Sequence, residues 1–202
     1  MIKLVKVKQE FYDLCNKYSV ADELLFNEKG RPCVLLIRLR YKGNLGTFVV
    51  PLRSNISPSV PKKDYFPLPP NKKTKPKYRH GVHYIKLFPV SKKYIDTYPV
   101  GGDAYYSAVL NILTKNERRI VMACQDYLRQ CENGNKHMMT PDIDGILAVL
   151  DMIREMNRRN RRMYQIAKRQ RTKSLSFFVG NFLTIISDFD ILYIEPRYIE
   201  VK

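Results

Sequence analysis

The sequence predicts an α+β fold, in which a small, strongly bent antiparallel sheet is covered by helices in one compact domain. Three observations predict it. Apolar runs bounded by turn residues, typical of strands, fill much of the first ninety residues. Apolar spacings of three and four residues, typical of amphipathic helices, dominate from about residue 103 to 155. With 202 residues, 45% of them hydrophobic, the chain is long enough for a well-packed core.

A β-hairpin stands at the centre of the predicted sheet. Residues 3–8 alternate charged and apolar side chains as a half-exposed strand does, and helical spacing follows from about Gln9. The apolar runs Cys33–Leu39 and Thr47–Val50 flank the turn residues Lys42-Gly43-Asn44. We therefore expect these two runs to pair as antiparallel strands.

A proline-rich segment interrupts the pattern. Seven prolines lie between Pro51 and Pro76, and each removes a backbone donor. We expect no regular structure there, and a long irregular connection inside a compact domain is usually functional or disordered. Residues 84–88 then predict a further strand, which ends at Pro89.

Two helices are predicted in the second half. Thr114 with Glu117 forms a capping-box pattern, and Gly134 predicts the end of this helix. The apolar stripe between them is Ile120, Cys124, Tyr127, Leu128 and Cys131. Thr140-Pro141 predicts the start of the next helix. Its stripe is Ile143, Ile146, Leu147, Leu150 and Ile153.

The domain organisation follows from these patterns. Residues 1–155 form the predicted domain, with the sheet mainly in 1–95 and the helices mainly in 103–155. Residues 156–202 comprise a basic helix and an apolar, β-like C-terminal segment that includes 177–179 and 191–194. We assign no role to this last segment. The stretch Arg158–Arg171 is equally consistent with an RNA contact and with a solvated helix face.

The chain is strongly basic. Its 36 lysines and arginines against 19 acidic residues give a net charge of +17, which favours a polyanionic partner. Eleven basic residues lie between Arg53 and Lys93, where Asp64 is the single acid. Aromatic residues are interleaved with them, and cations with exposed aromatic faces are the ingredients of single-stranded RNA binding. The alternative is a solvated basic loop without a partner. The residues that we expect to bind RNA are Asn55, Lys62, Lys63, Lys72, Lys73, Lys75, Lys77, Arg79, His83 and Lys86.

Other classes of partner and site are disfavoured. No apolar run approaches the roughly 20 residues that span a bilayer, and the N-terminus lacks the apolar stretch of a signal peptide, so we expect a cytoplasmic protein. The four cysteines form no Cys-x-x-Cys pair and are expected to pack as reduced thiols. A zinc site of Cys124, Cys131 and His137 would lack a fourth ligand. We expect no metal and no cofactor.

RNA can be cut without a metal, because its own 2′-hydroxyl is a nucleophile. The reaction needs a proton acceptor, a proton donor and fixed positive charge at the phosphate. Arg53 and Ser54 follow directly after a predicted strand, and His80 and His83 precede the next one. We expect His80 to be the exposed histidine and to move protons, whereas His83 is better explained as a half-buried, hydrogen-bonded strand residue.

These residues resemble the ToxN/AbiQ/TenpN group of type III toxin–antitoxin ribonucleases. The segment Phe48–Asn55 is similar to the strand-end Pro-Leu-x-Ser motif of that group, and Pro-Leu-Arg-Ser-Asn is closest to its TenpN-like and CptN-like members. Arg31–Ile37 resembles the segment in which a basic residue precedes the family's central strand. His80–Lys86 resembles the later segment that opens with glycine and runs into another strand. The resemblance covers residues 3–98 and, more faintly, the helices to about 155.

The resemblance implies a set of site residues. The family's catalytic serine falls on Ser54, and its preceding hydroxyl position falls on Arg53. Its basic residue before the central strand falls on Arg31. Its N-terminal tyrosine falls on Phe11 or Tyr12, of which only Tyr12 has a hydroxyl.

The sequence departs from the family at one charged position. The lysine that follows the serine in ToxN is replaced here by Ile56, so another cation must stabilise the phosphate. Arg53, Lys62 or His80 are the candidates.

The resemblance also implies an activity and a partner. The activity is sequence-selective, metal-independent cleavage of single-stranded RNA to a 2′,3′-cyclic phosphate, with growth arrest or phage defence as the result. The partner is a repeated pseudoknot RNA antitoxin, held between protomers in a closed protein–RNA assembly. Two alternatives stay open: a non-catalytic RNA-binding protein, such as a translational regulator or ribosome-associated factor, and a DNA-binding regulator, for which no recognition helix is evident.

Overall fold

The computed structural model describes residues 2–25 and 32–181, without the side chains of residues 37, 167 and 169–181. Arg31 and the segment 191–194 lie outside the described residues. The chain divides into two units, Met1–Arg154 and Glu155–Lys202, and each is described by itself. The first unit is an α+β domain built on an open antiparallel sheet, which confirms the predicted fold class.

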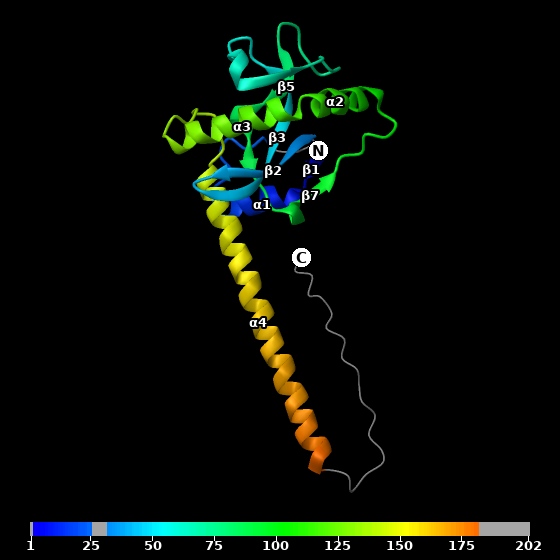
Figure 1. Cartoon of the computed structure of the whole chain (residues 1–202), viewed down its shortest axis with the longest axis vertical. Helices are drawn as coiled ribbons and strands as arrows, with labels where there is room; N and C mark the ends of the chain where they lie inside the picture. Colours follow the sequence, from blue (N-terminus) through cyan, green and yellow to red (C-terminus); the bar gives the residue numbers. More distant parts are fainter. Residues whose placement is uncertain (1, 26–31, 182–202) are drawn as a thin grey trace. The chain divides into compact units, whose positions relative to one another are not determined.

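The described residues contain seven strands, which form one sheet (Figure 1). Its order is β4-β5-β3-β2-β1-β7, and β6 pairs with β3 beside this path. The strands are β1 (Lys3–Val7), β2 (Cys33–Tyr41), β3 (Asn44–Ile56), β4 (Tyr65–Leu68), β5 (Arg79–His83), β6 (Phe88–Pro89) and β7 (Ile95–Thr97). All of the pairings are antiparallel. The predicted hairpin is confirmed as β2 and β3.

The described part of the chain also contains four α-helices. They are α1 (Gln9–Lys17), α2 (Ala104–Lys115), α3 (Glu117–Glu132) and α4 (Ile143–Asn181), with 3₁₀ turns η1 (Lys62–Asp64), η2 (Tyr84–Lys86) and η3 (Lys92–Tyr94). The helix expected at Gln9 is confirmed, as are the buried stripe of α3 and the turn at Gly134, which has a φ of 80°. No helix within the described residues has the length and apolar character to cross a membrane.

The sheet has a core on each face. Alternate strand residues, such as Leu36 and Val50, pack with Leu113, Ile120 and Leu128 of α2 and α3. Their neighbours in sequence, such as Val49, pack on the other side. To this second core, α1 contributes Phe11, Tyr12 and Cys15, and α4 contributes Ile146, Val149 and Leu150. This alternation is the two-residue period of a strand, and it decides which face each residue of the site occupies.

The prediction of no regular structure between Pro51 and Pro76 is wrong. The segment contains the end of β3, η1 and β4. Its prolines are tolerated because of where they fall. Pro67 lies in β4, the edge strand of the sheet, where a missing N–H costs no ladder bond on the outer side.

Four further boundaries differ from the prediction. The strand expected at 84–88 is η2 followed by β6, because a fully buried apolar run has no period that separates strand from turn. Thr114 lies in the last turn of α2, and its hydroxyl donates to the Leu110 carbonyl instead of capping α3. Helix α4 begins at Ile143, where the Asp142 carboxylate accepts from the Gly145 amide. Residues 177–179, expected to be β-like, belong to α4.

Gly81 in β5 is required by close packing. A Cβ built there would lie 2.2 Å from the carbonyl oxygen of Phe66 on β4. We expect Gly81→Ala to lower the free energy of unfolding by about 1–3 kcal/mol, as overpacking does. Gly101→Ala is the matched control, because nothing lies within 4 Å of its Cβ position. Urea unfolding of both variants tests this, and equal midpoints for the two would contradict the packing at β4 and β5.

Candidate functional site

The site is built where β3 changes its partner. β3 pairs with β2 as far as Pro51, and with β5 from Leu52 onward. Its register with β5 shifts between Arg53 and Ile56, as in a β-bulge. A bulge leaves residues unpaired and redirects their side chains. The predicted site residues Arg53, Ser54 and Asn55 lie in this interval.

Two asparagines fasten a loop to the end of β3. The Asn71 side-chain amide donates to the Ser54 hydroxyl at 2.8 Å. The Asn55 side chain donates to the Lys73 carbonyl at 3.2 Å and accepts from the Lys75 amide at 2.8 Å. Neutral side chains therefore hold the loop against Ser54, although the loop carries several lysines.

Arg53 is anchored by a buried histidine. Its guanidinium lies 3.3 Å from Nδ1 of His83, which must be the acceptor because a guanidinium only donates. Burial, reinforced by the charges of Arg53 and Lys86, lowers the pKa of His83 to about 3, so the imidazole is neutral. Its Nε2 is shielded from solvent and has no hydrogen-bond partner among the residues that the structure describes.

Lys86 is buried on the same face and paired with Glu23, which follows α1. The Lys86 ammonium lies 2.6 Å from the Glu23 carboxylate and 3.0 Å from its carbonyl oxygen. Burial lowers the pKa of Lys86, while the hydrogen bond from Lys86 lowers that of Glu23, and the pair is charged. His83 and Lys86 were expected to face RNA, and their burial corrects that expectation.

The expectation that His80 is the exposed histidine is also wrong. Its side chain is 3% exposed, and burial lowers its pKa. Nδ1 donates to the Pro69 carbonyl at 2.8 Å and lies 2.7 Å from the Tyr105 hydroxyl of α2. His80 and His83 are three residues apart and contact opposite sides of β5, so a single catalytic pair does not form.

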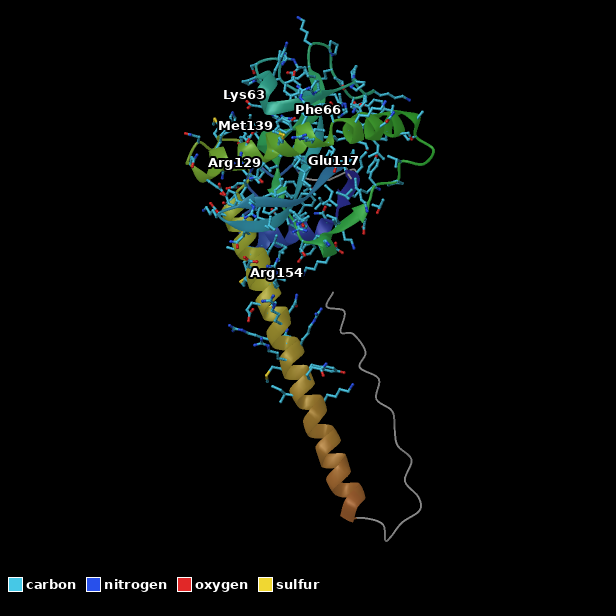
Figure 2. The ribbon with its side chains drawn as sticks, viewed as in Figure 1. Lys63, Phe66, Glu117, Arg129, Met139 and Arg154 are labelled. Carbon is cyan, nitrogen blue, oxygen red and sulfur yellow. The ribbon has the colours of Figure 1, made fainter. Side chains whose placement is uncertain are left out.

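The remaining predicted residues are distributed as follows. Tyr12 is buried in the core on the α1 side, with its ring edge-on to Phe11 at 5.7 Å. Arg79 is half-buried, donates to the Tyr65 hydroxyl at 3.0 Å and stacks over that ring. The exposed cations are Lys62, Lys63, Lys72, Lys73, Lys75 and Lys77. Lys63 and Phe66, on either side of the turn into β4, are labelled in Figure 2.

The cysteines do not contribute to a site in the described structure. All four are buried, and none forms a disulfide within the described residues, as expected for thiols packed as apolar residues. Burial raises the pKa of Cys15 to about 12. Among the residues that the structure describes, no three His, Cys, Asp or Glu side chains are grouped as metal ligands would be.

The sequence analysis missed three partners of the site residues. Asn71 holds Ser54, Tyr105 holds His80, and Glu23 holds Lys86. Asn71 could have been found, because Asn-x-x-Thr after two prolines favours the local turn that Asn71 and Thr74 make. Nothing in the sequence marks the other two, which are distant along the chain.

Comparison with known proteins supports the fold. No protein-family model matches the sequence, and no curated protein matches it. A solved structure from a study of bacterial type III toxin–antitoxin systems, with selective toxin inhibition by a non-coding RNA pseudoknot, matches with a TM-score of 0.53 at 16% identity. It covers 76% of this chain and 98% of the other. A second, from a study of a processed non-coding RNA that regulates a bacterial antiviral system, has a TM-score of 0.51 at 12% identity, covering 72% and 95%.

The chain shares the fold of both proteins. The resemblance drawn from the Pro-Leu-Arg-Ser motif is thereby confirmed at the level of the fold. At identities this low the likeness says nothing by itself about activity.

The buried histidines predict how stability depends on pH. Between pH 6.5 and about 3 the unfolded chain binds a proton at His83 that the folded chain does not, so acid favours unfolding. We expect the free energy of unfolding to fall by up to about 1.4 kcal/mol per pH unit from this group below its unfolded pKa. His83→Asn keeps an acceptor for Arg53 and does not titrate. Urea unfolding between about pH 6.5 and pH 5 should give a shallower slope for this variant, and an unchanged slope would argue against a buried neutral His83.

Proposed function

We propose that the chain is a metal-independent endoribonuclease of the type III toxin kind, which cuts single-stranded RNA through attack of the RNA's own 2′-hydroxyl. The observation that carries the proposal is the constellation at the end of β3. Ser54 is held by Asn71, and the adjacent Arg53 is held by His83. Both side chains lie at a break in the strand pairing, in a fold shared with structures from type III toxin–antitoxin and RNA-regulated antiviral systems.

The hydrogen bonds decide what Ser54 can do. Because the Asn71 amide donates to the Ser54 oxygen, the hydroxyl proton remains available for another acceptor. A phosphate oxygen is such an acceptor. Ser54 would orient the scissile phosphate so that the bond from the 2′-oxygen to phosphorus forms as the bond from phosphorus to the 5′-oxygen breaks. The 2′-hydroxyl loses its proton to solvent, and solvent returns a proton to the leaving 5′-oxygen.

Arg53 supplies the positive charge. The lysine that follows the serine in ToxN is Ile56 here, and Arg53 takes over its role. The Arg53 guanidinium stabilises the negative charge of the phosphate in the transition state. The neutral imidazole of His83 fixes its orientation without competing for the anion. Arg31, which lies outside the described residues, stays in the proposal as the second cation that the family resemblance implies. Tyr12, the hydroxyl that the resemblance also implies, does not stay, because it is buried in the core on the α1 side.

His80 has a different role from the one expected. Burial excludes it from direct proton transfer with solvent or RNA in this structure. Together with Tyr105 it binds the Pro69 carbonyl, two residues before Asn71. In the proposal His80 positions the loop that holds Ser54.

We further propose an RNA antitoxin as the partner and the cytoplasm as the location. Support comes from the net charge of +17, the exposed lysines between η1 and β5, and the non-coding RNAs of the two studies with the shared fold. A repeated pseudoknot RNA in a closed assembly would cover the cations and block Ser54. Growth arrest or phage defence would follow from its release.

One observation favours a non-catalytic RNA-binding protein as the second candidate. Both histidines of β5 are buried with lowered pKa values, so neither offers a proton acceptor poised near neutral pH. A protein that only binds RNA would need the lysines and not Ser54.

Removal of the Ser54 hydroxyl separates the two candidates. We expect Ser54→Ala to slow RNA cleavage by about 10²–10³-fold, the usual cost of one transition-state donor, while the Kd for RNA changes little. Growth arrest on expression without antitoxin should be lost. Asn71→Ala should lower the rate less, because the hydroxyl stays but loses its orientation. Gel analysis of a labelled RNA in excess chelator measures the rate.

Ser59→Ala is the matched control, since Ser59 is an exposed serine in the turn that follows β3. It should cleave like the parent chain. If Ser54→Ala still arrests growth and cuts RNA at the parent rate, the site is wrongly assigned.

A further inference from the structure

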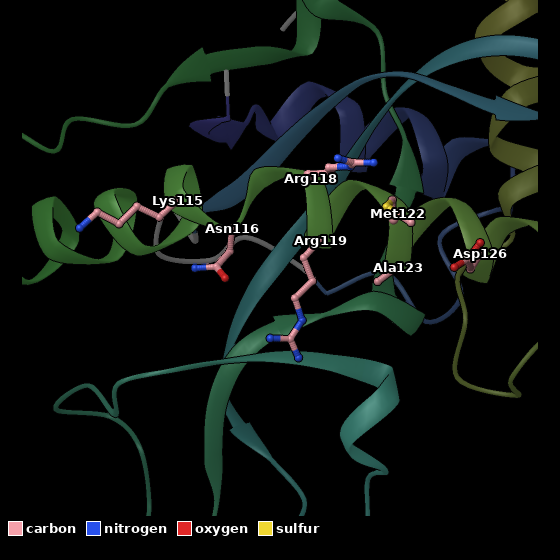
Figure 3. Close-up of a pocket in the computed structure, with 7 residues that line it drawn as sticks. All are labelled: Lys115, Asn116, Arg118, Arg119, Met122, Ala123 and Asp126. Carbon is pink, nitrogen blue, oxygen red and sulfur yellow. The ribbon is translucent and has the colours of Figure 1, made fainter.

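A hollow of about 510 Å³ lies at the junction of α2 and α3, away from the end of β3 (Figure 3). Its size is within the range of small-molecule sites. The lining residues are Lys115, Asn116, Arg118, Arg119, Met122, Ala123 and Asp126. It lies on the face of the sheet that α2 and α3 cover, whereas Arg53 and His83 lie on the face that carries α1.

The charge of the hollow is positive. Lys115, Arg118 and Arg119 contribute cations, and in the part of the chain that the structure describes none of the three forms an ion pair. The one acidic lining residue, Asp126, is bound to Arg129 at 2.8 Å, which offsets its charge. An anion entering the hollow would therefore meet cations and little repulsion.

The hollow also has an apolar wall. Met122 is 54% exposed, which is unusual for a large apolar side chain on an otherwise polar helix face. Ala123 lies beside it. Methionine is polarizable and adapts to flat aromatic groups, so this wall suits a base while the cations suit a phosphate.

Arg119 ties the hollow to the sheet. Its guanidinium lies 5.6 Å from the centre of the Phe66 ring on β4, and Figure 3 shows it reaching from α3 toward the strands. Phe66 is in register with Val82, which is in register with Leu52, next to Arg53. Two strand spacings amount to roughly 10 Å. The hollow and the proposed cleavage site therefore lie two strands apart on opposite faces of the sheet, and an RNA that passes around the edge strand β4 can contact both.

We propose that this hollow is a second RNA contact, which takes one unpaired nucleotide with one of its flanking phosphates on Lys115, the other on Arg118 and its base against Met122. This second contact rests on the proposed function in one respect only, namely that RNA is the ligand. An acidic protein segment would also be attracted by the cations, but the exposed Met122 and the stacked Arg119 favour a planar base.

The test is RNA affinity in the Ser54→Ala chain, which should bind without cutting. A fluorescent unstructured RNA is titrated by anisotropy at several salt concentrations. Lys115→Ala/Arg118→Ala should weaken binding about tenfold and reduce the slope of log K against log salt by about 1.4, since each phosphate contact of a single strand contributes roughly 0.7. Met122→Ala should weaken binding without changing the slope.

Lys17→Ala/Lys136→Ala is the matched control, because it removes two exposed cations elsewhere in the first unit. Its affinity should change by less than about twofold. An equal loss in the two double variants would overturn the proposal in favour of general charge attraction. Unchanged RNA affinity in Lys115→Ala/Arg118→Ala would overturn it too, and would leave an acidic peptide as the ligand to test. If the parent chain cuts no RNA but the hollow variants lose affinity, the second contact stands and the proposed nuclease falls.

Discussion

The partner change of β3 is the constraint on which the rest of the structure depends. Its first half is held between β2 and β6 in the centre of the sheet, with a core on each face. Its second half pairs with β5, and the register shift after Arg53 interrupts the ladder. Because the strand is rigid up to that break, the side chains at the break are placed accurately for contact with a ligand. Gly81 permits the arrangement by letting β4 approach β5 closely.

The basic segment is organised by neutral groups. The segment from Arg53 to Lys93 contains eleven basic residues and one acidic residue, Asp64. Ion pairs within the segment therefore cannot offset the repulsion between its cations. Asn55 and Asn71 hold the loop through hydrogen bonds that do not consume the lysine charges. Lys86 differs from the exposed lysines, because it is buried and its charge is paired with the Glu23 carboxylate. The result is a stable scaffold whose exposed positive charge is left for a polyanion.

Local pattern predicted the hairpin, the helix at Gln9 and the stripe of α3, because each has a period or a turn of its own. It failed between Pro51 and Pro76, since proline at an edge strand costs little and the edge position of β4 is set by distant pairing. It also placed His80 in solvent, because the covering Tyr105 comes from α2. The position of Ser54 after the hairpin was predictable. Its partner Asn71 and the His83 anchor of Arg53 depend on the β3–β5 register, which no local signal gives.

The central claim is that the RNA's own 2′-oxygen breaks the strand at a phosphate held by Ser54 and Arg53. The most direct measurement compares two RNAs that differ by one 2′-deoxy substitution at the mapped cleavage position, in excess chelator. The account predicts that the all-ribose RNA is cut to a 2′,3′-cyclic phosphate end and that the substituted RNA resists cleavage there. Equal cleavage of both RNAs, or cleavage only when a divalent ion is restored, would contradict it.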